Sequence, residues 1–110
     1  MQRRKIMCRM KDYPGLYLKA KGIVRTTGIN PIMPGCEMLV RAIVICKIQG
    51  TKNLYNAVAS ESSVVPALKD LTPEEEERHP VKQMILEAMR SVGIEDDSVK
   101  LFIQELADQI

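Results

Sequence analysis

Apolar and polar residues alternate along much of the first half of the chain. The stretches 5–10, 16–21 and 37–48 place every second residue on one side, which is the period of a β-strand. The middle of 37–48 is apolar on both sides, so we expect this strand at the centre of a sheet. A fourth, weaker strand is expected over 53–60. The segment 26–35 holds two Gly and two Pro and predicts a loop.

The second half has the spacing of amphipathic helices. Thr72 and Glu75 flank Pro73 in the pattern of a capping box, which marks a helix start. A helix is expected over 80–92 and ends near Gly93. A last helix follows and runs to the end of the chain. The short connection between these two helices predicts an antiparallel helical hairpin.

These patterns predict an α+β fold in a single domain that spans residues 1–110. An N-terminal antiparallel sheet or small open barrel is expected over residues 4–60. It would pack with a C-terminal α-helical hairpin over 73–110. Its core would be mainly aliphatic, because the chain has no Trp and one Phe.

Charge divides the chain into a basic and an acidic half. Residues 1–55 hold 11 Lys or Arg against 2 Asp or Glu, a net charge of +9. Residues 56–110 hold 5 Lys or Arg against 12 Asp or Glu, a net charge of −7. Such a division indicates a basic surface for a polyanion. The alternative is that the two halves neutralise each other within the fold.

The basic half predicts a non-enzymatic protein that binds single-stranded or structured RNA or DNA with low sequence specificity. If these segments are strands, several cations and one aromatic residue would share a face of the sheet. In single-strand binders, cations contact the phosphate backbone and aromatic rings stack on bases. A solvated strand face is the alternative. The predicted nucleic-acid-binding residues are Arg3, Arg4, Lys5, Arg9, Tyr17, Lys19, Lys21, Arg41 and Lys47.

A second hypothesis is a protein-interaction adaptor or regulatory subunit. The final helix carries an apolar stripe, and its surplus over what the sheet covers would dock on a protein partner or on a second copy of the chain. The candidate partner-binding residues are Phe102, Leu106 and Ile110. If both helical stripes pack on the sheet, no such surface is left.

Residues that could carry catalysis or bind a metal are few. His79, the only His, is expected on the surface or as a cap, and Cys36 is the only Cys expected in a loop. Three Cys and one His lack the paired spacing of zinc sites, and no Gly-rich phosphate loop occurs. We therefore expect no enzyme activity, no metal and no cofactor. The odd number of Cys and the absence of a run of about 20 apolar residues favour an intracellular protein without a membrane span.

Overall fold

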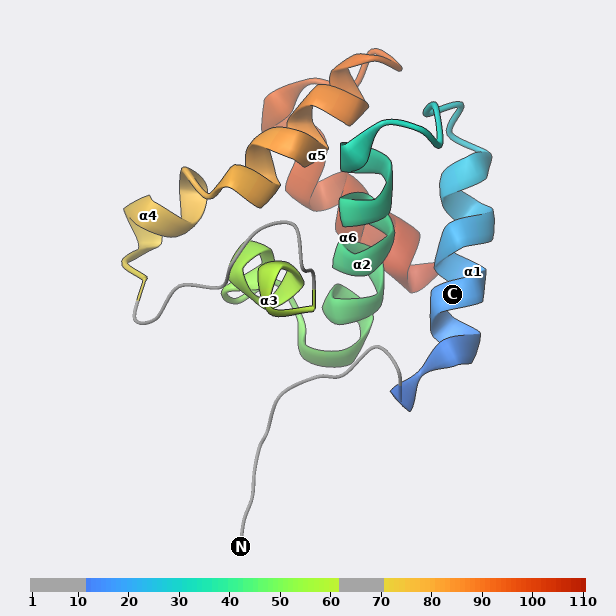
Figure 1. The fold of residues 1–110 in the computed structure, drawn as a ribbon, viewed down its shortest axis with the longest axis horizontal. Helices are drawn as coiled ribbons and strands as arrows, with labels where there is room; N and C mark the ends of the chain where they lie inside the picture. Colours follow the sequence, from blue (N-terminus) through green and yellow to red (C-terminus); the bar gives the residue numbers. More distant parts are fainter. Residues whose placement is uncertain (1–11, 62–70) are drawn as a thin grey trace, which may run out of the picture.

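Helices alone make up the regular structure of the described residues. The computed structural model describes residues 12–61 and 71–110, and no strand occurs in either stretch. In chain order the elements are α1 (Pro14–Arg25), α2 (Pro34–Gln49), α3 (Leu54–Ser60), α4 (Pro73–Glu77), α5 (Pro80–Arg90), the short 3₁₀-helix η2 (Asp96–Ser98) and α6 (Val99–Asp108) (Figure 1).

Helix α2 forms the centre of the molecule. Helices α1, α3, α5 and α6 each pack against it, so that it is covered on several sides (Figure 1). Side chains all round α2 are accordingly buried, and a helix that is apolar all round is stable only when it is covered in this way. These buried side chains are Met38, Leu39, Val40, Ala42, Ile43, Val44 and Ile45.

The predicted sheet or barrel over 4–60 is wrong for the described residues. The expected central strand 37–48 lies within α2. The prediction failed because an apolar run that is covered on all sides is compatible with either a buried strand or a buried helix. The sequence does hold two signs of the helix. Its 16 residues exceed the usual length of a strand, and Pro34 occupies the first helical turn, where proline is tolerated.

The other expected strands need the same correction. The stretch 16–21 lies in α1, where Ala20 and Val24 are buried four residues apart. Leu18 would lie on the same side of a strand as the buried Ala20, yet it is 68% exposed. The stretch 53–60 forms α3 instead of a weak strand. The stretch 5–10 lies outside the described residues.

The second half begins its helices where the sequence predicted them. The Thr72 hydroxyl accepts a hydrogen bond from the Glu75 amide at 3.1 Å, and the Glu75 carboxylate accepts one from the Thr72 amide at 2.8 Å. This confirms the capping box. Helix α5 ends close to the predicted position, and Gly93 follows it with φ at 82°.

The expected helical hairpin is wrong in its packing. Helices α5 and α6 both lie against α2 and are joined through η2, and neither takes the other as its main neighbour. Their apolar stripes therefore face a third helix rather than each other or a sheet. Core residues from both halves of the chain form one cluster around α2.

Candidate nucleic-acid interface

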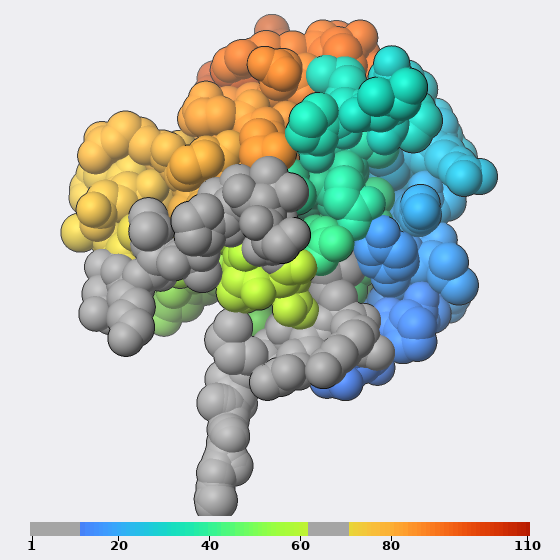
Figure 2. Space-filling view, viewed as in Figure 1, coloured from blue at the N-terminus to red at the C-terminus, as the bar shows by residue number. Residues whose placement is uncertain are grey.

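Helix α1 presents a basic face to solvent. Pro14 begins the helix, and Leu16, Ala20 and Val24 turn one side toward α2 at the four-residue spacing of a helix. The opposite side is exposed and carries Leu18, Lys21 and Arg25, which are three and four residues apart. We call these three residues the α1 face. Figure 2 shows α1 at the surface on one side of the molecule and α4 on the other.

The predicted pairing of Lys19 with Lys21 on one face does not occur. Residues two apart in a helix lie roughly 200° apart around its axis, so the two ammonium groups point to different sides. Both side chains are exposed. Lys21 belongs to the α1 face, while Lys19 lies at the other margin of the exposed side.

Tyr17, the predicted stacking residue, is engaged inside the protein. Its hydroxyl donates a hydrogen bond to the Glu37 carboxylate on α2, at 2.8 Å from Oε2 and 3.1 Å from Oε1. Burial raises the pKa of the Tyr17 phenol, and the bond to Glu37 raises it further. The Lys21 ammonium stands 5.8 Å from the ring centroid, a distance at which a cation–π interaction holds. Tyr17 therefore fastens α1 to α2.

The two predicted cations of α2 lie apart from the α1 face. Arg41 is half-buried and pairs with Glu37 at 3.0 Å, and its guanidinium also donates to the Glu61 carbonyl. Lys47 is exposed near the end of α2, where it lines a hollow against α6. The ion pair of Arg41 with Glu37 therefore has a structural role in this arrangement. Arg3, Arg4, Lys5 and Arg9 lie outside the described residues.

Several ion pairs between described residues lie within one half of the chain. Among the described residues, Arg41 pairs with Glu37 in the basic half, while Glu77 with Lys82 and Lys100, and Arg90 with Asp96, pair in the acidic half. Arg41 also donates a hydrogen bond to the Glu61 carbonyl, which lies in the acidic half. The Lys19, Lys21 and Arg25 side chains of α1 have no ion-pair partner within 12–61 and 71–110.

The alternative docking residues face largely inward. Leu106 is 5% exposed, and Phe102 and Ile110 are partly buried against the core. The exposed apolar side chain of α6 is instead Leu101, with 59% of its surface exposed. The stripe of α6 is thus used mainly for packing on α2.

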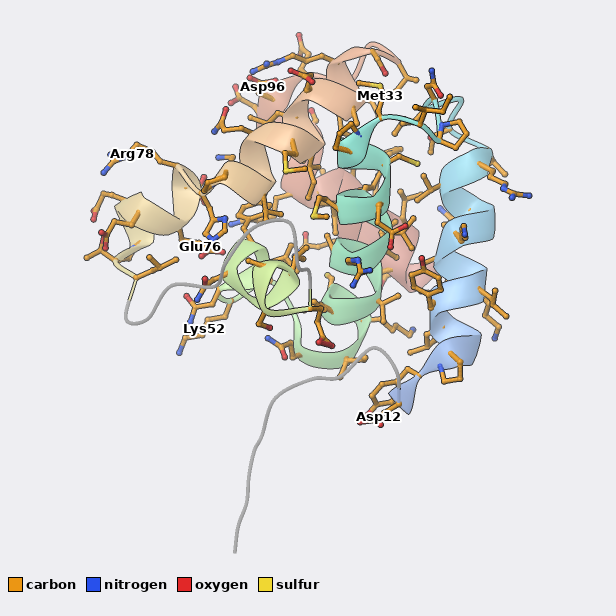
Figure 3. The ribbon with its side chains drawn as sticks, viewed as in Figure 1. Asp12, Met33, Lys52, Glu76, Arg78 and Asp96 are labelled. Atoms are coloured by element: carbon orange, nitrogen blue, oxygen red, sulfur yellow. The ribbon has the colours of Figure 1, made fainter. Side chains whose placement is uncertain are left out.

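Two buried polar side chains, Glu76 and His79, accept hydrogen bonds from backbone amides at the starts of α3 and α5. Glu76 reaches from α4 toward α3 (Figure 3), where its Oε1 accepts hydrogen bonds from the Tyr55 amide at 2.6 Å and the Asn56 amide at 3.4 Å. His79 is 2% exposed, and its Nδ1 accepts from the Val81 amide at 3.1 Å. His79 is therefore a cap, one of the two roles expected for it. Glu76 Oε2 and His79 Nε2 are buried and have no hydrogen-bond partner in the described part of the chain.

The two described cysteines, Cys36 and Cys46, have raised thiol pKa values. Cys36 is buried in α2 rather than in a loop, and burial raises the pKa of its thiol, which disfavours the reactive thiolate. Burial also raises the pKa of Cys46. Within 12–61 and 71–110, no three His, Cys, Asp or Glu side chains group as metal ligands would. Cys8 lies outside these ranges.

Sequence reasoning missed Leu18 and Arg25 as neighbours of Lys21. The signal was present, since Leu16, Ala20 and Val24 repeat at four residues and leave Leu18, Lys21 and Arg25 together on the other side. An alternating pattern over six residues hid this longer period. Tyr13, just before α1, is a further exposed aromatic side chain, at 40%.

Comparisons of the chain with protein-family models, with curated proteins and with solved structures find no match. The described part of the chain holds no helix of the length and apolar character needed to cross a bilayer. Any assignment of function therefore has to come from the residues of this chain.

Proposed function

We propose that the protein binds nucleic acid through the basic side of α1. The proposal rests on one observation: among the described residues, Lys19, Lys21 and Arg25 have no ion-pair partner. The acidic half of the chain packs into the same hydrophobic core as α1, and still none of its described carboxylates pairs with these cations. Uncompensated cations on one surface are the electrostatic footprint of phosphate binding.

The sequence before α1 supports the same surface. Residues 1–13 add five Lys or Arg against one Asp, so the basic character continues directly into α1. Arg3, Arg4, Lys5 and Arg9 belong to this stretch and remain predicted contacts. A basic segment next to a basic helix suits a polyanion longer than a single phosphate group.

The side chains on α1 favour low sequence specificity. Asn and Gln, which read adenine edges, do not occur in Pro14–Arg25, and Arg25 is the only arginine of the helix. Lysine ammonium groups contact phosphates as point charges without fixing a base. We therefore propose single-stranded or structured RNA or DNA as the ligand. An intracellular location, where such ligands occur, is part of the proposal.

Fluorescence anisotropy with labelled single-stranded RNA and DNA, across a salt series, tests the proposal. The informative variant is Lys21→Glu with Arg25→Glu, which reverses both cations of the α1 face. The matched control is Lys52→Glu with Arg78→Glu, because these exposed residues lie elsewhere and the change in net charge is identical.

We expect the α1 variant to bind about tenfold more weakly or worse, and each lost phosphate contact to reduce the salt slope by about 0.7 for single strands. The control should retain most of the affinity. Equal binding by wild type and the α1 variant, with both folded, would overturn the proposal. Equal losses in both variants would also overturn it, because only net charge would then matter.

A further inference from the structure

Helix α6 carries an exposed face that mirrors the α1 face with opposite charge. Val99, Ile103 and Leu106 turn inward, and Leu101, Glu105 and Asp108 are exposed together on the other side. We call these three exposed residues the α6 face. Neither Glu105 nor Asp108 has an ion-pair partner among the described residues. The face therefore combines an exposed leucine with two uncompensated carboxylates.

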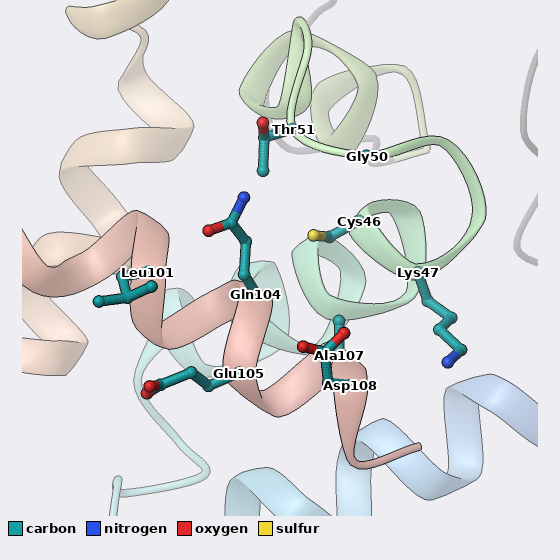
Figure 4. A pocket seen from close by; sticks show the side chains of 9 residues that line it. All are labelled: Cys46, Lys47, Gly50, Thr51, Leu101, Gln104, Glu105, Ala107 and Asp108. Atoms are coloured by element: carbon teal, nitrogen blue, oxygen red, sulfur yellow. The ribbon is translucent and has the colours of Figure 1, made fainter.

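A hollow of about 430 Å³ lies beside this face. It is bounded by the end of α2 and the loop after it, and by α6 (Figure 4). Leu101, Gln104, Glu105 and Asp108 line it from α6, and Cys46 and Lys47 line it from α2. In Figure 4, Leu101 and Glu105 stand on one side of the hollow and Lys47 on the other, with Asp108 between them.

The two faces have matching spacing along their helices. On α1, the cations follow Leu18 by three and seven residues, and on α6 the carboxylates follow Leu101 by four and seven residues. These offsets are close to one and two helical turns. Two helices laid in parallel would therefore place Leu18 beside Leu101, Lys21 beside Glu105 and Arg25 beside Asp108.

We propose that a second copy of this chain docks its α1 face on the α6 face. Leu18 and Leu101 are among the large apolar side chains that the fold leaves most exposed, at 68% and 59%, and the contact would cover both. The charges that flank them are opposite in sign, which favours this orientation over others. Because the contact joins two different surfaces, it closes into a symmetric oligomer or grows into chains.

One consequence rests on the proposed function. The α1 face would be covered by the second copy and would also be needed by nucleic acid, so the two partners would compete for it. Self-association would then limit nucleic-acid binding at high protein concentration, and nucleic acid would dissociate the assembly.

Charge reversal and mixing of the full chain test the contact. One variant is Lys21→Glu with Arg25→Glu, and the other is Glu105→Lys with Asp108→Lys. Sedimentation velocity over a concentration series at low salt would give the mass of each and of their mixture. Lys52→Glu and Glu95→Lys, at exposed positions off both faces, are controls, and circular dichroism checks that every variant is folded.

We expect the wild type and controls to self-associate and each double variant to do so about tenfold more weakly. The 1:1 mixture of the two double variants should recover association. The intact α1 face of one variant meets the intact α6 face of the other, and the two reversed faces are also opposite in charge. A wild type that stays monomeric at every concentration would overturn the proposal. So would variants that associate like the wild type, or a mixture that does not recover.

The variant with the reversed α6 face separates this proposal from the proposed function. Glu105→Lys with Asp108→Lys leaves α1 unchanged, so it should lose self-association and still bind RNA or DNA. If no variant or wild type binds nucleic acid while the mixing result holds, the proposed function fails and the contact stands. If binding depends on α1 but the wild type remains monomeric, the contact fails and the proposed function stands.

Discussion

Gly35, in the first turn of α2, lies against the backbone of Met84 in α5. A Cβ atom at position 35 would stand 2.0 Å from the Met84 carbonyl oxygen and 2.9 Å from the Cβ of Ala88. Both distances are shorter than van der Waals contact, and the first involves backbone that cannot rotate away. The crossing of α2 and α5 therefore depends on the absence of a side chain at this position.

We predict that Gly35→Ala destabilises the protein by about 3 kcal/mol, because the helices have to separate to admit the methyl group. Urea unfolding followed by circular dichroism measures this loss. Gly22→Ala in α1 is the matched control, since a Cβ there meets nothing within 4 Å. It should stabilise by about 0.5–1 kcal/mol, because alanine favours a helix interior over glycine. A neutral Gly35→Ala would contradict the close approach.

Glu76 should matter for stability far more than its three glutamate neighbours. Its buried Oε1 accepts the amide hydrogens of Tyr55 and Asn56 at the start of α3, so it joins α4 to α3. Glu76→Ala removes this acceptor from the start of α3 and should cost about 2–3 kcal/mol. Glu76→Gln keeps an acceptor oxygen and should cost less. Glu74→Ala, at an exposed position, is the control, and an equal loss from Glu74→Ala would count against this role.

The second half of the chain could be predicted because its signals are local. The capping box at Thr72 and the spacing of Val81, Ile85 and Ala88 depend on neighbours within a few residues, and both occur as expected. What could not be predicted is how the helices pair. The apolar stripe of α5 has to pack against another element, but its sequence does not show whether that element is a helix or a sheet.

The first half failed because burial on all sides removes periodicity. In α2 the buried residues include Leu39, Val40 and Ile43, so burial there follows neither a two-residue nor a 3.6-residue period. Tertiary covering then decides between strand and helix, against the β preference of Val and Ile. The same error placed Lys19 and Lys21 together and concealed Arg25. The net positive charge of the segment remains the basis of the proposed interface.

His79 should make stability depend on pH near neutrality. Burial lowers the pKa of the imidazole, and Glu76 opposes that shift in part. The folded protein thus binds the proton less readily than the unfolded chain, whose His pKa is about 6.5. Stability is therefore full above that value and is lost as pH falls through the lower pKa of the folded state.

Thermal unfolding at a series of pH values between neutral and mildly acidic measures this dependence. His79→Asn is the informative variant, because Asn retains an acceptor for the Val81 amide and does not titrate. It should flatten the pH dependence in this range. The carboxylates with lowered pKa, Glu75, Glu77 and Asp96, act at more acidic pH. An unchanged slope in His79→Asn would assign the effect to another group.

The bond from Tyr17 to Glu37 should be measurable as a coupling between α1 and α2. Tyr17→Phe removes the hydroxyl donor and should cost about 0.5–1.5 kcal/mol, since the Glu37 carboxylate loses this hydrogen bond and keeps its pairing with Arg41. In a Glu37→Gln background the same substitution should cost less, and the difference is the energy of the pair. Tyr13→Phe, at an exposed tyrosine, is the control and should change nothing.

Amide hydrogen exchange would show which helix is loosened by Tyr17→Phe. Because Tyr17 joins α1 to the central helix, its loss should speed amide exchange in α1 more than in α5. Equal costs of Tyr17→Phe in the wild-type and Glu37→Gln backgrounds would show that the hydroxyl does not act through Glu37. A selective effect would instead show that the helix bearing the basic face is positioned by this contact, so that weakening it loosens the proposed interface as a unit.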